Sequence, residues 1–503
     1  MFVSPRAVSP AGTSPRIHPP LGAISVLAEV RRMGYEAILI DSAAEGLKRN
    51  LLVPSYNPVT VEDVEGVSYW KTGFKIGETV STVVEQHPDV IGISCCTLVD
   101  RKEASRLSSA LKEACPQVPI IMGGHEASQW YREILGETSY ENDSVPSVDY
   151  VVVGAGQGVF PKLLSFLEKK NNSDLPHGVA CRSNGRVIYS DPDPFEPDLY
   201  ALPDYSLLPK INVPGRQKPM DIYSYIGNPH AGRVSSFLGQ SAKPISYLPL
   251  LTSYGCGFSC SFCDTDKKLV RYTAENAMKV IEDFGNLYGL DYIDFMDNNF
   301  GGGDELSRRI AFEILSCVAE TDYQIGFSNG LTFESMSREN FRLLRQFAKN
   351  GNVRHLAFPC ENGNDRVLRM IRKPHNLRMV NSVLLFATEH LTGTNREGFF
   401  IGGFPETNGQ SAESPEEVEK TYQFMKQLLG QQLLHQAIFL TLSPVTREYR
   451  LRWRKLYPNA PFEHCLFSRR TGIWPYPSFI LDEMHRKVKS LNQDLGRAVT
   501  RQL

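Results

Sequence analysis

Apolar residues in the first third of the chain follow two alternating spacings. Residues 21–33 carry apolar side chains at the helical period, and residues 35–41 form a short apolar run typical of a buried strand. Further strands are predicted over 90–94, 119–122 and 150–153, with helices over 104–114 and from about Pro161. Strands separated by helices of ten or more residues pair in parallel, with right-handed crossovers. The pattern therefore predicts a doubly wound α/β domain over residues 1–174.

A second strand and helix series begins at Tyr247. Helical segments separate six short apolar runs, which lie at 248–252, 292–296, 324–328, 355–358, 398–402 and 437–442. This repeat predicts a partial, TIM-like (β/α)6 barrel over residues 246–445. Residues 446–503 are rich in arginine, proline and aromatic residues and show no repeat, so we expect a small helical cap there.

The segment between the two series has a different character. Residues 175–245 are punctuated by proline, as in Asp191-Pro192-Asp193-Pro194, and predict a linker. Within it, residues 181–189 predict a small hairpin that turns at Asn184-Gly185.

Composition narrows the class of protein. The 503 residues suggest two to four domains at about 150 residues each. Lys and Arg number 54 against 56 Asp and Glu, so there is no bulk positive field for nucleic acid or an anionic membrane. Ten cysteines are too sparse for a disulfide scaffold, prolines interrupt the first twenty residues, and no apolar run approaches 18 residues. We expect a cytoplasmic protein without a membrane span.

Turns at one edge of the first domain are candidates for ligand binding. In flavodoxin-like, open parallel sheets, ligands bind at the carboxyl ends of the strands. The segments 94–97, 123–125 and 154–158 follow three predicted strands there. Their glycines could instead serve only to make tight turns. The candidate residues are Ser94, Thr97, Gly123, Gly124, His125, Gly154 and Gly156.

Three cysteines fall within eight residues immediately after the first strand of the second series. A loop with the spacing of Cys256, Cys260 and Cys263 can place three thiolates around a [4Fe-4S] cluster and leave the fourth iron open. The alternatives are a zinc site or three unligated core cysteines. Structural zinc needs a fourth ligand, and no matching cysteine or histidine pair lies nearby downstream.

This triad, with Phe262 before the third cysteine, resembles the signature of radical S-adenosylmethionine (SAM) enzymes. The resemblance continues downstream. The segments 292–300, 358–368 and 400–407 are similar to the second-strand, fourth-strand and fifth-strand segments of that family. The resemblance implies a [4Fe-4S] cluster on Cys256, Cys260 and Cys263, with SAM on its open iron.

The N-terminal domain resembles the cobalamin-binding domain that precedes the barrel in the largest radical SAM subgroup. The matching segments are 19–22, 34–36, 90–94, 123–125 and 148–158. Two positions depart from the subgroup. Its Gly-Glu-Gly-Glu turn reads Gly154-Ala155-Gly156-Gln157 here, and its Arg-Gly-Cys-Pro entry to the cluster reads Tyr254-Gly255-Cys256-Gly257. The resemblance implies cobalamin as a third cofactor, with no protein side chain on the cobalt.

The resemblance also implies roles for side chains at the strand ends of the barrel. Phe262 would flank the adenine of SAM, and Glu361 would accept hydrogen bonds from its ribose. Ser328 and Asn329 would lie near the methionine carboxylate, with Asp297 and Asn298 as further candidates at the second strand. Each of these could instead cap a helix, form a turn or pack in the core. No catalytic residue beyond these binding groups is identified.

Members of this subgroup are mostly methyltransferases. The resemblance therefore implies a cobalamin-dependent methyltransferase that acts, through a 5′-deoxyadenosyl radical, on an unactivated carbon of a natural-product or lipid-like small molecule. The alternative is a non-methylating radical enzyme, such as a dehydratase, epimerase or cyclase, with a vestigial cobalamin-like domain. An iron-sulfur electron carrier is disfavoured because it needs no open iron. The enzyme would need an external electron donor of the flavodoxin or ferredoxin type.

Overall fold

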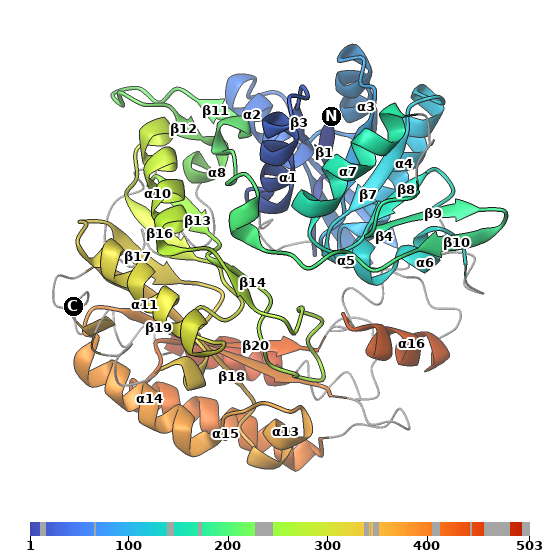
Figure 1. Cartoon of the computed structure of the whole chain (residues 1–503). Helices are drawn as coiled ribbons and strands as arrows, with labels where there is room; N and C mark the ends of the chain where they lie inside the picture. The colour runs from blue at the N-terminus through green and yellow to red at the C-terminus, as the bar shows by residue number, and fades with distance from the viewer. Residues whose placement is uncertain are drawn as a thin grey trace. The chain divides into compact units, whose positions relative to one another are not determined.

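The computed structural model forms two compact units (Figure 1). One comprises Met1–Pro229 with Glu282–Gly289, and the other comprises His230–Ile281 with Leu290–Leu503. The structure describes residues 1–10, 17–64, 67–137, 145–169, 174–226, 245–336, 342, 344–345, 352–404, 413–442, 445–456 and 483–494. Each unit is considered by itself below.

A seven-stranded sheet organises the first unit, in the order β10-β9-β8-β7-β6-β1-β3. Its parallel strands are β1 (Phe2–Ser4), β3 (Leu39–Asp41), β6 (Ile91–Ser94), β7 (Ile120–Gly123) and β8 (Tyr150–Val152). In chain order these five strands stand 2-1-3-4-5, which is the flavodoxin-like arrangement. The doubly wound prediction is confirmed. The switch point lies between β1 and β6.

The hairpin expected in the connecting segment extends this sheet. β9 (Val179–Ser183) pairs antiparallel with β8, and β10 (Arg186–Tyr189) pairs with β9. Asn184 and Gly185 have φ angles of 48° and 76°, so the turn that joins the two strands is left-handed at both central residues, as the sequence predicts.

Helices α1 (Leu21–Arg32) and α7 (Gly156–Glu168) form one core with the sheet. Their apolar faces meet Phe2, Ile121 and Val152, which occupy one face of their strands. α7 begins at Gly156 rather than near Pro161, because the turn after β8 closes earlier and the proline lies inside the helix. The remaining helices are α2 (Ser42–Leu52), α3 (Ile76–Glu85), α4 (Arg101–Ala114), α5 (His125–Gln129) and α6 (Tyr131–Ile134).

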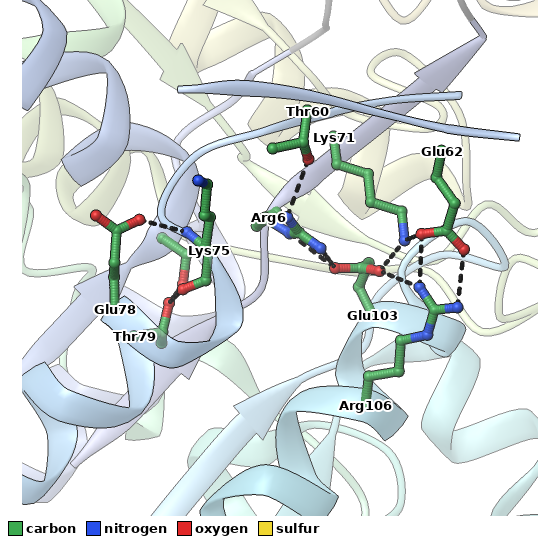
Figure 2. A network of polar contacts seen from close by, with 10 residues as sticks. Arg6, Thr60, Glu62, Lys71, Lys75, Glu78, Thr79, Glu103 and Arg106 are labelled. Carbon is green, nitrogen blue, oxygen red and sulfur yellow. Dashed lines mark hydrogen bonds and ion pairs between the residues drawn. The ribbon is translucent and has the colours of Figure 1, made fainter. Parts of the chain in front are cut away.

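A small antiparallel sheet in the first unit was not predicted from the sequence. Its strands are β2 (Ala7–Pro10), β5 (Val67–Thr72) and β4 (Val59–Val64). A network of ion pairs fastens it to α4 (Figure 2). Glu103 of α4 accepts from Arg6 at 2.8 Å and from Lys71 at 2.6 Å, while Glu62 pairs with Lys71 and Arg106. Buried charges need partners, and the two buried members, Lys71 and Glu103, each have at least two of opposite charge.

The segment before the barrel also packs within the first unit. β11 (Lys210–Ile211) and β12 (Met220–Asp221) form a two-stranded ribbon that leads into α8 (Ile222–Tyr225). The Tyr223 hydroxyl donates to the Asp41 carboxylate at 2.5 Å, and both side chains are buried. The end of β3 is thereby joined to a segment 182 residues away.

Six parallel strands form the partial barrel of the second unit, in the order β13-β16-β17-β18-β19-β20. All six predicted strands are present. Their bounds are β13 (Tyr247–Leu250), β16 (Tyr292–Phe295), β17 (Gln324–Phe327), β18 (Val353–Glu361), β19 (Asn395–Gly402) and β20 (Gln436–Thr441). The helices that follow these strands along the chain are α10 (Ala274–Tyr288), α11 (Glu305–Ala319), α13 (Asp365–Met370), α14 (Leu377–His390) and α15 (Pro415–Gly430). Of these, α10 belongs to the second unit only up to Ile281.

The predicted cap is helical where the structure describes it. Its helices are α16 (Arg447–Leu456) and a helix over residues 483–494, and the rest of 446–503 lies outside the described residues. Asn492 exchanges hydrogen bonds with the backbone of Ala437 at 3.1 and 2.7 Å, which fixes the second helix on β20. Over the described part of the chain, no helix has the length and apolar character needed to cross a membrane.

Candidate cluster and cofactor sites

The three cysteines lie on a loop closed by a short hairpin. β14 (Ser253–Tyr254) enters the loop and β15 (Val270–Arg271) leaves it, and the two strands pair antiparallel. Asp266 and Asn299 fix the first cysteine: Cys256 N–H donates to the Asp266 carbonyl at 2.9 Å, and Asn299 donates to the Cys256 carbonyl at 2.8 Å. Gly255 has φ 81°, and a Cβ there would lie 2.0 Å from the Lys268 carbonyl oxygen. Only glycine fits this turn.

Asp297 holds the base of the same loop. Its carboxylate accepts from Thr252 N–H at 3.1 Å and from Thr252 Oγ1 at 2.8 Å, and it also accepts from the Ser253 hydroxyl. Arg271 Nη1 lies 3.9 Å away. Burial raises the pKa of Asp297, and the Arg271 guanidinium opposes that rise. The carboxylate expected to meet SAM is thus engaged in anchoring the cluster loop.

The thiols suit an iron-sulfur cluster better than a single metal ion. All three are free, with Cys260 buried and Cys256 and Cys263 half-buried. Burial raises the pKa of Cys260 to about 11, and Lys373 opposes that rise. Among the described residues, no three His, Cys, Asp or Glu side chains converge as ligands of one ion. A cubane cluster takes each thiolate on a different iron, so its cysteines need not converge on one point.

A buried ion pair lies beside these thiols. Lys373 Nζ is 2.8 Å from Glu361, and the two side chains are 9% and 7% exposed. The same ammonium lies 5.8 Å from the centre of the Phe262 ring, within cation–π range. Burial opposes the charge on Lys373, but Glu361 and the Cys260 thiol outweigh it and raise the pKa of the ammonium. The lysine therefore stays protonated.

Phe262 is half-buried in an apolar cluster. Its ring packs against Phe404 at 5.7 Å between centroids and against the buried residues Val367, Leu368 and Ile371. This packing accounts for an aromatic residue here without a ligand. Contact with adenine stays a prediction.

Glu361 has a left-handed backbone at the end of β18, with φ 60°. The following residue explains why it persists. Asn362 donates to Glu413 at 2.7 Å and accepts from Thr421 at 3.1 Å. Glu413 also accepts from the backbone of Gly403 at 2.8 Å. Burial raises the pKa of Glu413 to about 7. A buried network thus holds the turn that aims Glu361.

Two of the predicted residues meet at the carboxyl ends of neighbouring strands. Asn329 donates to Asn298 Oδ1 at 3.1 Å and to the Met296 carbonyl at 3.1 Å, and both asparagines are exposed. Ser328 lies below them, buried, with its N–H on Asp294 at 3.0 Å. The two amides are well placed to meet a polar ligand, whereas Ser328 is less accessible.

The turns after β6 and β7 in the first unit are bonded to each other. Cys95 N–H donates to Gly123 at 2.7 Å, and Ala127 N–H donates to Cys95 at 3.2 Å. Gly124 has φ 110°, and a Cβ there would lie 2.6 Å from the Cys95 carbonyl oxygen. A glycine at this position is required by the turn itself. His125, the exposed first residue of α5, follows it.

The other predicted residues of this edge divide into exposed and packed positions. Ser94 lies 3.3 Å from Cys96 Sγ, and the Thr97 hydroxyl donates to Asp100 at 2.9 Å. Gly154 is exposed at the end of β8, with φ 87°. Gly156 lies in the first turn of α7, where a Cβ would approach Val26 of α1 to 2.6 Å. Close helix packing explains Gly156. A Cβ at Gly123 would make ordinary contact with Val152, at 3.7 Å, and a Cβ at Gly154 would approach Pro192 to 3.2 Å. Binding of cobalamin here stays a prediction for each residue.

Sequence reasoning did not single out Lys373 or Glu413. Lys373 contacts Glu361, 12 residues earlier in the chain, and Glu413 contacts Asn362, 51 residues earlier. Neither position carries a local spacing that would reveal the contact.

Two protein-family models match the chain. A B12-binding domain matches residues 10–164, and the radical SAM superfamily matches residues 250–424. The first match includes β3, β6, β7 and β8 of the first sheet, and the second runs from the end of β13 through β19.

Similar proteins extend over most of the chain. Cytidylyl-2-hydroxyethylphosphonate methyltransferase of Streptomyces wedmorensis is 25% identical over 495 residues, covering 92% of this chain and 86% of the relative. An anaerobic magnesium-protoporphyrin IX monomethyl ester cyclase of Synechocystis is 23% identical over 360 residues, covering 71% and 59%. The solved structure of TsrM, a radical SAM methyltransferase of Kitasatospora setae, superposes with a TM-score of 0.61 at 14% identity, covering 92% and 77%. The last similarity shows that the fold is shared.

Proposed function

This chain is a radical SAM enzyme with a B12-binding domain ahead of its barrel, and we propose that it is a cobalamin-dependent methyltransferase acting on an unactivated carbon of a small molecule. We assign cobalamin binding to residues 1–174 and the radical chemistry to residues 246–445. Held by Cys256, Cys260 and Cys263, a [4Fe-4S] cluster would supply the electron for cleavage of SAM, and cobalamin bound to the first sheet would carry the methyl group.

The observation that carries the proposal is the cysteine loop on the first barrel strand. Cys256, Cys260 and Cys263 are three free thiols on a loop whose base is fixed by Asp297. Three thiolates can bind three irons and leave the fourth for SAM. Rigid anchoring matters because a radical must be generated within reach of the substrate and away from water.

The strand ends of the barrel would bind the rest of SAM. Glu361 would accept hydrogen bonds from the ribose, and its left-handed backbone is held by the Asn362–Glu413 contact. The exposed amides of Asn298 and Asn329 would bind the methionine end. In TIM-like barrels the carboxyl ends of the strands are where reactive groups gather, which supports this assignment.

The substrate class rests on the resemblance and on the relatives. According to its name, the Streptomyces relative methylates cytidylyl-2-hydroxyethylphosphonate, which is a small molecule. We propose a natural-product or lipid-like small molecule for this chain, and an external flavodoxin-type or ferredoxin-type electron donor. The free thiols among the described residues support work in a reducing cytoplasm.

Product accounting tests the proposal. A cobalamin-dependent methyl transfer consumes one SAM to methylate cobalt and a second to make the radical. Anaerobically reconstituted enzyme, given its substrate, should therefore form S-adenosylhomocysteine and 5′-deoxyadenosine together, as measured by mass spectrometry. Formation of 5′-deoxyadenosine alone would refute methyl transfer.

A second function is favoured by one local feature. The turn after β8 reads Gly154-Ala155-Gly156-Gln157, without the two carboxylates usual in this subgroup, and one relative is named as a cyclase. A non-methylating radical enzyme with a vestigial cobalamin-like domain would load the cluster and cleave SAM without retaining cobalamin. Cobalamin content after reconstitution distinguishes the two functions.

A further inference from the structure

One buried cation lies within the environment of the cluster cysteines. Lys373 is on the loop between α13 and α14, 9% exposed, with Nζ 2.8 Å from Glu361. Burial raises the pKa of the Cys260 and Cys256 thiols, and the Lys373 charge opposes that rise. Water screens a buried charge poorly, so a charge at this position also acts on a cluster held by these thiols.

The loop that carries this lysine is fastened to the cysteine loop. Ser261, between two of the cysteines, donates its N–H to the Ile371 carbonyl at 3.1 Å. Arg372 has φ 59°, and Lys373 N–H donates to the Leu368 carbonyl at 2.9 Å. These bonds hold the loop that carries Lys373 against the cysteine loop. The contact with Glu361 holds the ammonium itself, and the ring of Phe262 lies under it.

We propose that Lys373 and Glu361 form a charge pair that sets the reduction potential of the cluster, with Lys373 raising it and Glu361 lowering it. This role goes beyond the binding of SAM, and it depends on the cluster but not on methyl transfer. It makes Lys373 a positioning and electrostatic residue rather than a catalytic one.

The sign follows from the charge that reduction adds. One electron from the external donor makes the cluster more negative by one charge, and a fixed cation stabilises that product more than the oxidised state. A neighbouring carboxylate has the opposite effect. Removing Lys373 takes away the cation and also leaves the Glu361 carboxylate without its counterion. Both effects make reduction of the cluster harder.

The experiment is a redox titration with dithionite and mediators, followed by the electron paramagnetic resonance of the reduced cluster. Lys373→Met should lower the equilibrium constant for reduction at least tenfold, which is 59 mV for one electron. Glu361→Gln should shift the potential in the positive direction. The double variant should fall between the two. Iron content of each variant is measured alongside.

Two further variants separate charge from packing. Lys373→Arg keeps the charge and should keep the potential of the unchanged enzyme. Lys267→Met is a matched control, because Lys267 donates to the Cys263 carbonyl at 3.0 Å but is exposed to solvent. Its loss should shift the potential by less than half as much.

Three outcomes overturn the inference. The first is that the potential shifts with the same sign in Lys373→Met and Glu361→Gln. The second is that it shifts in neither variant at full iron content, and the third is that Lys373→Arg and Lys373→Met shift it equally. Each would show that charge is not the cause. If Lys373→Met fails to hold iron, the positive shift of Glu361→Gln still decides. Failure of the proposed methyl transfer appears separately, as missing S-adenosylhomocysteine at an unchanged potential.

Discussion

The two regions expected to bind cofactors, the surroundings of the cysteine loop and the turns at the edge of the first sheet, differ in the residues that form them. Around the cysteine loop, charged side chains are buried and bonded. Asp297 is 1% exposed, and the side chains of Glu361 and Lys373 are 7% and 9% exposed. At the edge of the first sheet the turns are glycines and short polar residues, and His125, Thr97 and Gly154 are exposed. In the barrel region, individual charged side chains are held in place, whereas the sheet edge is lined by the backbone of its turns. We therefore expect iron loading to be lost when a charge or a cysteine is removed, and cobalamin binding to be lost when a turn is changed sterically.

The largest effect should come from the cluster ligands. Cys260→Ala removes one thiolate of three, and the remaining two cannot hold the cluster with an open iron. We expect iron content to fall to background and formation of 5′-deoxyadenosine to stop. Cys317→Ala is the control, since that thiol lies on α11 far along the chain from the loop, and it should leave iron content unchanged.

The next effect should come from the anchor of the cluster loop. Asp297→Asn leaves the buried Arg271 guanidinium without its carboxylate and turns an amide donor toward Thr252 or Ser253. Breaking a buried charge pair from one side costs about 3 kcal/mol. We expect a lower unfolding temperature and partial iron loading by elemental analysis. Full loading at unchanged stability would contradict the anchoring role.

A steric change should act on the first unit alone. Gly124→Ala places a Cβ 2.6 Å from the Cys95 carbonyl, in a backbone region that other residues avoid. The cost should be about 2 kcal/mol. Cobalamin retention should fall while the iron content stays normal, as measured by absorbance and iron analysis. Gly185→Ala, at a left-handed hairpin position with open space, should cost about 1 kcal/mol and retain cobalamin.

The smallest effect should be a pH dependence in the second unit. The pKa of Glu413 is about 7 in the folded chain against an ordinary 4.5, so the folded state holds this proton more tightly. Stability from this group is therefore greatest at low pH and falls as pH rises from 4.5 to 7. Between pH 6 and 7.5 the loss should be about 1 kcal/mol. Glu413→Gln should remove that part of the pH dependence of the free energy of unfolding. The measurement is urea unfolding at several pH values, with hydrogen exchange of the β18 and β19 amides as the readout.

Most strands could be predicted because each carries its signal locally. The six barrel strands and four of the five parallel strands of the first sheet are short apolar runs between helices, and these ten were predicted. β1 (Phe2–Ser4) was not predicted, because it has only three residues at the start of the chain. The sheet of β2, β4 and β5 was missed because polar residues such as Glu62 and Lys71 interrupt its pattern. Both residues pair with α4: the buried Lys71 bonds Glu103, and the partly exposed Glu62 bonds Arg106. These contacts span at least 32 residues, so the local spacing does not reveal them.

The cysteine loop could be singled out for the same reason, since three cysteines within eight residues form a motif by themselves, and their role as cluster ligands stays a prediction. The supporting residues could not be singled out. Gly156 was read as a cofactor residue, yet its small size is explained by Val26, 130 positions earlier in the chain. Lys373 and Glu413 likewise owe their importance to partners that are distant in sequence, at the end of β18. Sequence spacing reveals ligands that stand together, and it cannot reveal the groups that hold them.

The left-handed conformation of Glu361 sets two contributions to stability against each other at a single position. A residue with a Cβ costs about 1 kcal/mol more than glycine at such a φ angle. Glu361→Gly would relax the backbone, but it would also leave the buried Lys373 ammonium without its carboxylate, which costs about 3 kcal/mol. A laboratory selection for thermal stability would therefore keep an acidic side chain at this position in spite of the strained backbone.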